Sequence, residues 1–197
     1  MMSPALDPAA ELQAAVTQYH QDGDVAVLFA RLGALSRDAD PEALMAAVEP
    51  FRDMPEVVIP TYERVVAERP THARALVVLA NAYWLTGRGP DVVGDLASRA
   101  MAADPENRGA WHLWALSEPD PRDRTARWQQ VTQRFPQDQL ARAALADNAA
   151  SLAGAEHDPL ALDLAVRTYE GLLAETHDPA HRIALEGALN TLKAWKL

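Results

Sequence analysis

Residues 70–105 of the sequence read P-T-H-A-R-A-L-V-V-L-A-N-A-Y-W-L-T-G-R-G-P-D-V-V-G-D-L-A-S-R-A-M-A-A-D-P. In the first half, apolar residues recur at spacings of three, one and three, at Leu76, Leu79, Ala80 and Tyr83. This spacing places them on one face of a helix, with a small residue where a neighbouring helix approaches closely. Gly87 and the Gly89-Pro90 pair interrupt the helix. A second apolar helix follows, so the segment predicts a helix hairpin.

The hairpin resembles one tetratricopeptide repeat, a helix-turn-helix unit with a large-x-x-large-small-x-x-Tyr line and a closing Pro. Here that line is Leu76, Leu79, Ala80 and Tyr83, and the closing residue is Pro105. Members of the family are mostly scaffolds and adaptors that bind other proteins. The resemblance implies the same mode of action for this chain.

The composition predicts an all-α protein. Of the 197 residues 49% are apolar, mainly Ala, Leu and Val, and 6% are aromatic. Because Ala is the best helix former, we expect an ordered helical chain with essentially no sheet. Acidic residues outnumber basic ones by 28 to 18, and Lys and Arg form no run. The resulting net charge of -10 repels phosphate backbones, so a nucleic-acid partner is not expected.

The first residues, M-M-S-P-A-L-D-P-A-A-E-L, have neither the basic n-region nor the apolar h-region of a signal peptide. No later window has the uninterrupted apolar length of a membrane span. We therefore expect a cytoplasmic protein without a membrane partner. The sequence contains no cysteine, which excludes disulfides, thiolate zinc sites and a cysteine nucleophile.

The dipeptide Asp-Pro occurs six times, and we interpret each occurrence as the start of a helix. An Asp side chain accepts from the free amides of a first helical turn, and Pro fits the first helical position because it lacks an N–H. Simple turns are the alternative interpretation. The six dipeptides are Asp7-Pro8, Asp40-Pro41, Asp104-Pro105, Asp120-Pro121, Asp158-Pro159 and Asp178-Pro179.

The same spacings recur along the chain. With the resemblance, they imply one continuous right-handed superhelical solenoid of antiparallel hairpins over residues 1–197, with about eleven helices. The expected elements are a degenerate first hairpin (8–38), a second hairpin (41–70), the best repeat (71–104), a further clear repeat (105–136), a last hairpin (137–176) and a capping helix (179–197). The alternative for the part before Pro55 is a separate helical bundle packed on a shorter array.

Two prolines and three tryptophans allow finer predictions. Pro50 should end or kink the first helix of the second hairpin, and Pro60 should delay the start of its second helix by a turn. The tryptophans fall on lines that face neighbouring helices, which predicts core positions for Trp111, Trp114 and Trp128.

The chain contains no recognisable catalytic or cofactor motif. His177 and His181 are four residues apart, but Pro179 intervenes and no H-E-x-x-H follows, so we expect no metal site. Gly87-Arg88-Gly89 looks like a phosphate loop, but it lies between two helices of one hairpin and is interpreted as a turn. No nucleotide-binding glycine pattern or nucleophile elbow occurs. We therefore expect neither enzyme activity nor a cofactor.

A second stripe in the central repeat predicts the binding surface, because it is separate from the core line. Its members are Arg74, Val77, Asn81 and Trp84. The resemblance implies that this side lines a concave groove, in which Asn81 hydrogen-bonds the backbone of a bound peptide. Later first helices would add His112, Leu116 and Arg142 or Asp147. A partly solvated helix face is the alternative interpretation.

The family's clamp for a terminal carboxylate uses Lys and Arg where this chain has Val77 and Leu113, so the resemblance favours an apolar ligand segment over a chaperone tail. The leading hypothesis is a protein-interaction scaffold or adaptor that binds a peptide or partner helix in the groove. The alternatives are a helical enzyme or small-ligand protein with a pocket inside the curve, and a structural oligomer subunit. The expected partner is a protein or peptide, and homo-oligomerisation is left open.

Overall fold

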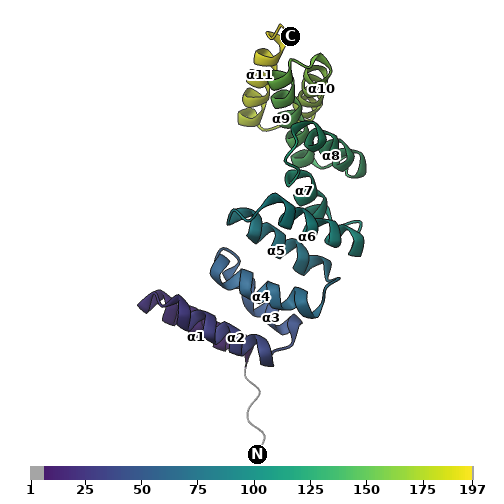
Figure 1. Ribbon diagram of the computed structural model, residues 1–197. Helices are drawn as coiled ribbons and strands as arrows, with labels where there is room; N and C mark the ends of the chain where they lie inside the picture. Colours follow the sequence, from purple (N-terminus) through teal and green to yellow (C-terminus); the bar gives the residue numbers. More distant parts are fainter. Residues whose placement is uncertain (1–6, 197) are drawn as a thin grey trace, which may run out of the picture. The chain divides into compact units, whose positions relative to one another are not determined.

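The computed structural model describes residues 7–196, and over this range the chain is built from helices alone (Figure 1). Eleven α-helices and one short 3-10 helix are present, with no strand among the described residues. The predicted all-α class is confirmed. Within the described range, none of the helices combines the length and apolar character needed to cross a bilayer.

The chain divides into two compact units, and the boundary in the sequence falls between Asn107 and Arg108. We call them the first and the second unit and describe each by itself. A single solenoid domain over the whole chain stays a prediction.

The first unit contains three successive helix pairs. They are α1 (Pro8–Asp22) with α2 (Val25–Asp38), α3 (Pro41–Val48) and η1 (Glu49–Phe51) with α4 (Pro55–Glu68), and α5 (Ala73–Leu85) with α6 (Pro90–Ala103). The two helices of each pair contact each other, and α4 also contacts α2 and α5. Each pair therefore buries its apolar face against a neighbouring pair, as helical repeats do.

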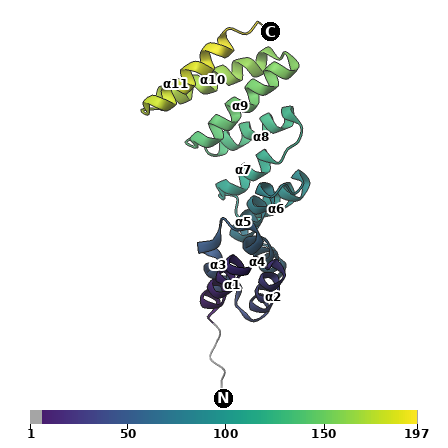
Figure 2. The same ribbon diagram turned by 90° about the vertical axis from the view of Figure 1, so that its left-hand side faces the viewer.

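The second unit continues the pattern with α7 (Arg108–Leu116), α8 (Pro121–Arg134), α9 (Gln139–Glu156), α10 (Pro159–Glu175) and α11 (Pro179–Lys193). Each of these helices contacts the next one along the chain. Figure 2 shows α9, α10 and α11 side by side. The last helix contributes Leu185, Leu189 and Leu192 to the core of this unit.

Five of the six Asp-Pro dipeptides begin a helix, namely α1, α3, α8, α10 and α11. In all five the Asp carboxylate accepts from amides of the first turn. The prediction was wrong for Asp104-Pro105. The Asp104 side chain accepts instead from the amide of Glu106 at 3.0 Å, which closes a turn, and α7 begins only at Arg108.

Proline acts as expected at one position and not at another. The α-helix α3 ends at Val48, and Pro50 lies in the 3-10 turn that follows. The helix α4 begins at Pro55 and continues through Pro60, so the predicted later start was wrong. Packing of the apolar face of α4, which buries Tyr62 and Val65, outweighs the one helical hydrogen bond that Pro60 removes.

The predicted core line of the central hairpin is buried: Ala80 is fully inaccessible and Tyr83 is 8% exposed. Trp128 is buried as predicted, at 4% exposure. Trp111 and Trp114 are only partly buried, which corrects the prediction that they are core residues. They pack edge to face at 5.7 Å on the margin of the cluster around Trp128, where Arg127 covers Trp114.

Candidate functional site

The helix α5, which carries the predicted stripe, is held at both ends. Its first turn is capped by His72, whose Nδ1 accepts from the amide of Ala75 at 3.1 Å. At its end the Thr86 hydroxyl donates to the Ala82 carbonyl at 2.8 Å, and Gly87 follows with φ of 74°, a left-handed conformation that favours glycine. The stripe therefore stands on a helix with defined ends.

The structure brings together the four stripe residues of the first unit on one side of α5. At about 100° per residue, the centre of the stripe lies roughly 160° around the helix from the centre of the line of Leu79 and Tyr83, which face other helices. Asn81 is exposed, Trp84 is 37% exposed and Val77 is partly buried. The side chain of Arg74 is exposed and pairs with Glu49 at 3.2 Å.

Asn81 and Trp84 offer complementary chemistry one helical turn apart. Among the described residues, no hydrogen bond engages the Asn81 amide, which can both donate and accept. Trp84 adds a large apolar surface with an indole N–H. The arrangement suits a polypeptide, which presents backbone amides and apolar side chains together.

His112, predicted for the same surface, is engaged inside the second unit. Its Nε2 lies 2.7 Å from Oδ2 of Asp138, and its ring packs edge to face on Trp128 at 5.4 Å. Burial by itself would raise the pKa of Asp138. Hydrogen bonds from the amide of Ala141 and from His112, with the charge of Arg108, outweigh burial and hold that pKa below its ordinary value.

Arg142 and Leu116 also have internal contacts. Both terminal nitrogens of Arg142 donate to Glu175, one of them at 2.8 Å, and this lowers the pKa of Glu175. Leu116 packs on the cluster around Trp128. Asp147, the alternative to Arg142, is exposed and accepts from the hydroxyl of Tyr169. The role of His112, Leu116 and Arg142 in binding stays a prediction.

Leu113 does not face a ligand, although the comparison with the family's carboxylate clamp places it at a ligand-binding position. It is 6% exposed, so its side chain is not available to a ligand in this structure. The comparison with a carboxylate clamp therefore rests on Val77 alone.

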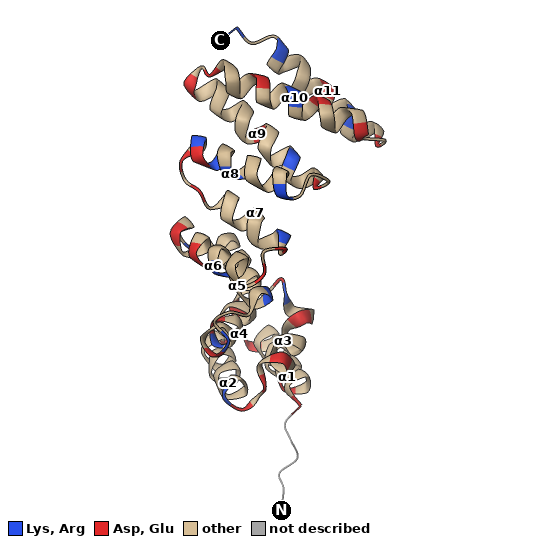
Figure 3. Cartoon of the chain, turned by 90° about the vertical axis from the view of Figure 1, so that its right-hand side faces the viewer, with Lys and Arg blue, Asp and Glu red and all other residues tan. Residues whose placement is uncertain are grey.

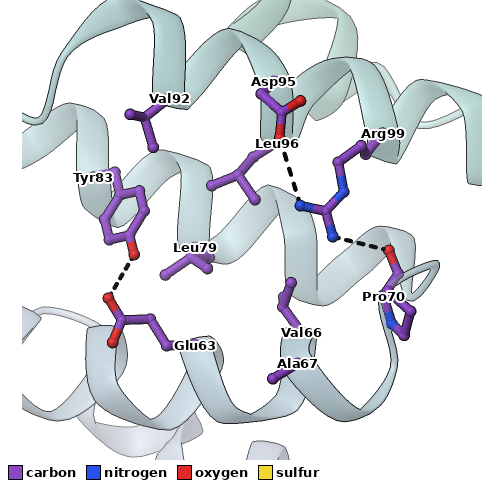
Figure 4. A pocket seen from close by; sticks show the side chains of 10 residues that line it. All are labelled: Glu63, Val66, Ala67, Pro70, Leu79, Tyr83, Val92, Asp95, Leu96 and Arg99. Carbon is purple, nitrogen blue, oxygen red and sulfur yellow. Dashed lines mark hydrogen bonds and ion pairs between the residues drawn. The ribbon is translucent and has the colours of Figure 1, made fainter.

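Sequence reasoning missed a groove on the opposite side of α5, between α4 and α6 (Figure 4). Its volume is about 490 Å³, and Leu79 and Tyr83 of α5 line it together with Val66 and Leu96. Val92 at its edge is 41% exposed. The only sequence signal was Val92. It is adjacent in sequence to a buried residue of α6 and is therefore rotated by about 100° from the buried side of that helix.

Three polar contacts lie in the groove. The Tyr83 hydroxyl donates to Glu63 at 2.5 Å, and burial together with this bond raises the pKa of Tyr83 to about 12. Arg99 pairs with Asp95 at 3.5 Å and donates to the Pro70 carbonyl. Over the described residues, no group of three His, Asp or Glu side chains is arranged to hold a metal ion.

Comparison with known proteins gave matches only at the level of structure. No protein-family model matches the sequence, and no curated protein matches it. A thermophilic TPR protein from Thermus thermophilus is 18% identical with a TM-score of 0.57, over 92% of this chain and 98% of that chain.

Two further solved structures are similar. MamA is 13% identical with a TM-score of 0.60, over 87% of this chain and 97% of that chain. A tetratricopeptide repeat protein from Parabacteroides merdae is 15% identical with a TM-score of 0.52, over 94% of this chain and 87% of that chain. At these identities the likeness establishes the arrangement of helices.

Proposed function

Because the chain has the tetratricopeptide-repeat fold, we propose that it is a protein-interaction scaffold or adaptor that binds a peptide or a partner helix on the exposed side of α5. The observation that carries the proposal is the exposed Trp84 one turn from Asn81, whose amide has no partner among the described residues. Trp is one of the residue types enriched among the hot spots near the centres of protein interfaces.

Each residue of the stripe has a distinct part in this proposal. Trp84 and Val77 contact apolar side chains of the ligand, and Asn81 accepts from and donates to its backbone. Arg74 already pairs with Glu49, and that carboxylate also pairs with Arg52. An apolar segment therefore fits better than an acidic tail, because a ligand carboxylate would have to compete with Glu49 for Arg74.

The overall charge supports the choice of a protein ligand over nucleic acid. A net charge of -10 without a Lys or Arg cluster opposes binding to phosphate backbones. We propose a cytoplasmic protein or peptide as the partner and assign no enzyme activity to the chain.

The experiment is affinity capture with three versions of the purified chain and one control, followed by mass spectrometry. The wild type should retain a specific protein that Asn81→Ala and Trp84→Ala both lose. The control is Ile183→Ala, which removes an apolar side chain that is 70% exposed on α11, outside the proposed surface. It should retain the same protein as the wild type. Equal retention by all versions would place any binding site elsewhere.

A further inference from the structure

A second face of the first unit carries two neighbouring grooves. The acidic groove, named for Glu63 and Asp95, is the one between α4 and α6 (Figure 4). The basic groove lies between α2 and α4, has a volume of about 430 Å³ and is named for Arg37 and Arg64. They are similar in size and differ in charge.

The helix α4 forms the ridge between the two grooves. Pro60 and Arg64 line the basic groove, whereas Glu63 and Ala67 line the acidic one. At about 100° per residue these two pairs lie roughly 60° apart around α4. A ligand that crosses α4 can therefore enter both grooves at once.

Each groove exposes a large apolar side chain beside a buried apolar floor. Phe29 is 48% exposed next to the buried Leu32 of the basic groove. In the acidic groove the exposed residue is Val92, beside the buried Leu96. A methyl group built at Gly33 would meet no atom within 4 Å, so the basic groove is open there. Covering these side chains would remove apolar surface from water, which favours association.

The acidic groove favours a cation from the ligand. Glu63 accepts from the neutral Tyr83 hydroxyl, and no ion pair among the described residues engages it. Asp95 is 68% exposed on its side chain and shares Arg99 with the Pro70 carbonyl. Arg88 lies over the Tyr83 ring, 4.6 Å from its centre, and is the other nearby cation.

The basic groove favours an anion. Arg37 lies in the last turn of α2, and none of the described interactions engages its guanidinium. Arg64 pairs with Glu68 one turn along α4. The wider surroundings are acidic: residues 7–107 contain 16 Asp and Glu against eight Arg and no Lys, drawn in red and blue in Figure 3. Arg37 therefore offers a favourable position for a carboxylate of the ligand within a unit that is otherwise acidic.

We propose that this face binds one amphipathic protein helix laid across α4, with two apolar side chains seven residues apart. The end over the acidic groove carries Lys or Arg, and the end over the basic groove carries Asp or Glu. The helices α2 and α4 contact each other, and packed helices lie about 8–10 Å apart, so we take this distance as the spacing of the two grooves across α4. Seven residues of helix rise about 10.5 Å, which matches that spacing. The proposal is independent of the α5 stripe, because it uses the other side of the first unit.

The test uses three synthetic helical peptides as probes, measured by fluorescence anisotropy against the full chain. The first peptide has two Leu seven residues apart, Lys at one end and Glu at the other. The second has Glu at both ends, and the third has Ser in place of both Leu. We expect the first to bind and the other two to bind at least about tenfold more weakly, since each loses one class of contact.

Variants of the chain locate the peptide. Phe29→Ser and Val92→Ser should each lower the affinity for the first peptide several-fold. The double variant Glu63→Gln with Asp95→Lys should lower the affinity for the first peptide and raise the affinity for the second, because the altered acidic groove then attracts an anion. The matched control is Leu160→Ser, which removes an apolar side chain 79% exposed in the second unit and should leave affinity unchanged.

Three results would overturn the proposal. The first is failure of the first peptide to bind at about 1 mM, which corresponds to a negligible affinity. The second is equal binding of all three peptides. The third is unchanged affinity for the first peptide in the groove variants. Dimerisation that Phe29→Ser abolishes in sedimentation experiments would assign the face to a second copy of the chain instead. None of these results bears on the α5 stripe, whose test uses Asn81 and Trp84.

Discussion

His112 Nε2 lies 2.7 Å from Oδ2 of Asp138, and this contact joins α7 to the start of α9. The carboxylate is 4% exposed on its side chain and also caps α9 by accepting from the amide of Ala141 at 3.1 Å. Asp138 therefore holds two helices of the second unit through one buried group, which makes it a sensitive point for stability.

Asp138→Asn should lower the free energy of unfolding at pH 7 and should lower it less at acid pH. The folded-state pKa of Asp138 is below its ordinary value of 3.8, so its stabilising contribution is present above that value and is lost as the pH falls through the folded-state pKa. Urea denaturation at pH 7 and at about pH 3 measures the difference. A penalty of equal size at both pH values would contradict the role of the charged carboxylate.

Gly154→Ala should stabilise the chain less than Gly171→Ala does. Replacing Gly by Ala inside a helix gains about 0.5–1 kcal/mol. A methyl group at Gly171 meets no atom within 4 Å, whereas one at Gly154 would lie 3.2 Å from the ring of Trp195, which must then move. Thermal unfolding of both variants gives the comparison.

The explanation through Trp195 has its own control. In a Trp195→Ala background the ring is absent, so Gly154→Ala should gain as much as Gly171→Ala. If the two glycine variants still differ in that background, contact with Trp195 is not the cause.

Ala80→Leu should destabilise the chain by roughly 1–3 kcal/mol, because overpacking a filled core forces neighbours out of place. Ala80 is fully buried on α5, between the helices of the first unit. Ala184→Leu on the exposed side of α11 adds the same atoms where space is open, and it should be nearly silent. Equal melting temperatures of the Ala80→Leu variant and the wild type would show that the core line is misassigned.

Asn81→Ala and Trp84→Ala should each weaken the binding of a captured partner by about 1 kcal/mol or more, with unchanged helical circular dichroism. Both side chains are exposed on α5, so their removal leaves the core intact. Isothermal titration with the purified partner measures the effect. Unchanged affinity in both variants would exclude this side of α5.

Much of the fold followed from local chemistry that the sequence displays. Asp7, Asp40 and Asp178 each precede a Pro and cap a helix, because capping needs only the Asp side chain and the amides that follow it. The apolar line through Leu76 and Tyr83 predicted a buried face for the same reason, since helix geometry sets which residues share a side. The error at Asp104 arose because a turn satisfies the same carboxylate equally well.

The sequence by itself determined the all-helical class, most helix starts, the core line of the central hairpin and the stripe of Asn81 and Trp84 on its other side. Only the tertiary structure decided which apolar residues stay exposed. Phe29 and Val92 belong to apolar helices, yet each lies at the edge of a groove because neighbouring helices do not cover them. The tertiary structure also places the ring of Trp195 beside Gly154, a contact that the sequence does not indicate. Exposure depends on the distance between helices far apart in the sequence, and helical periodicity carries no information on that distance.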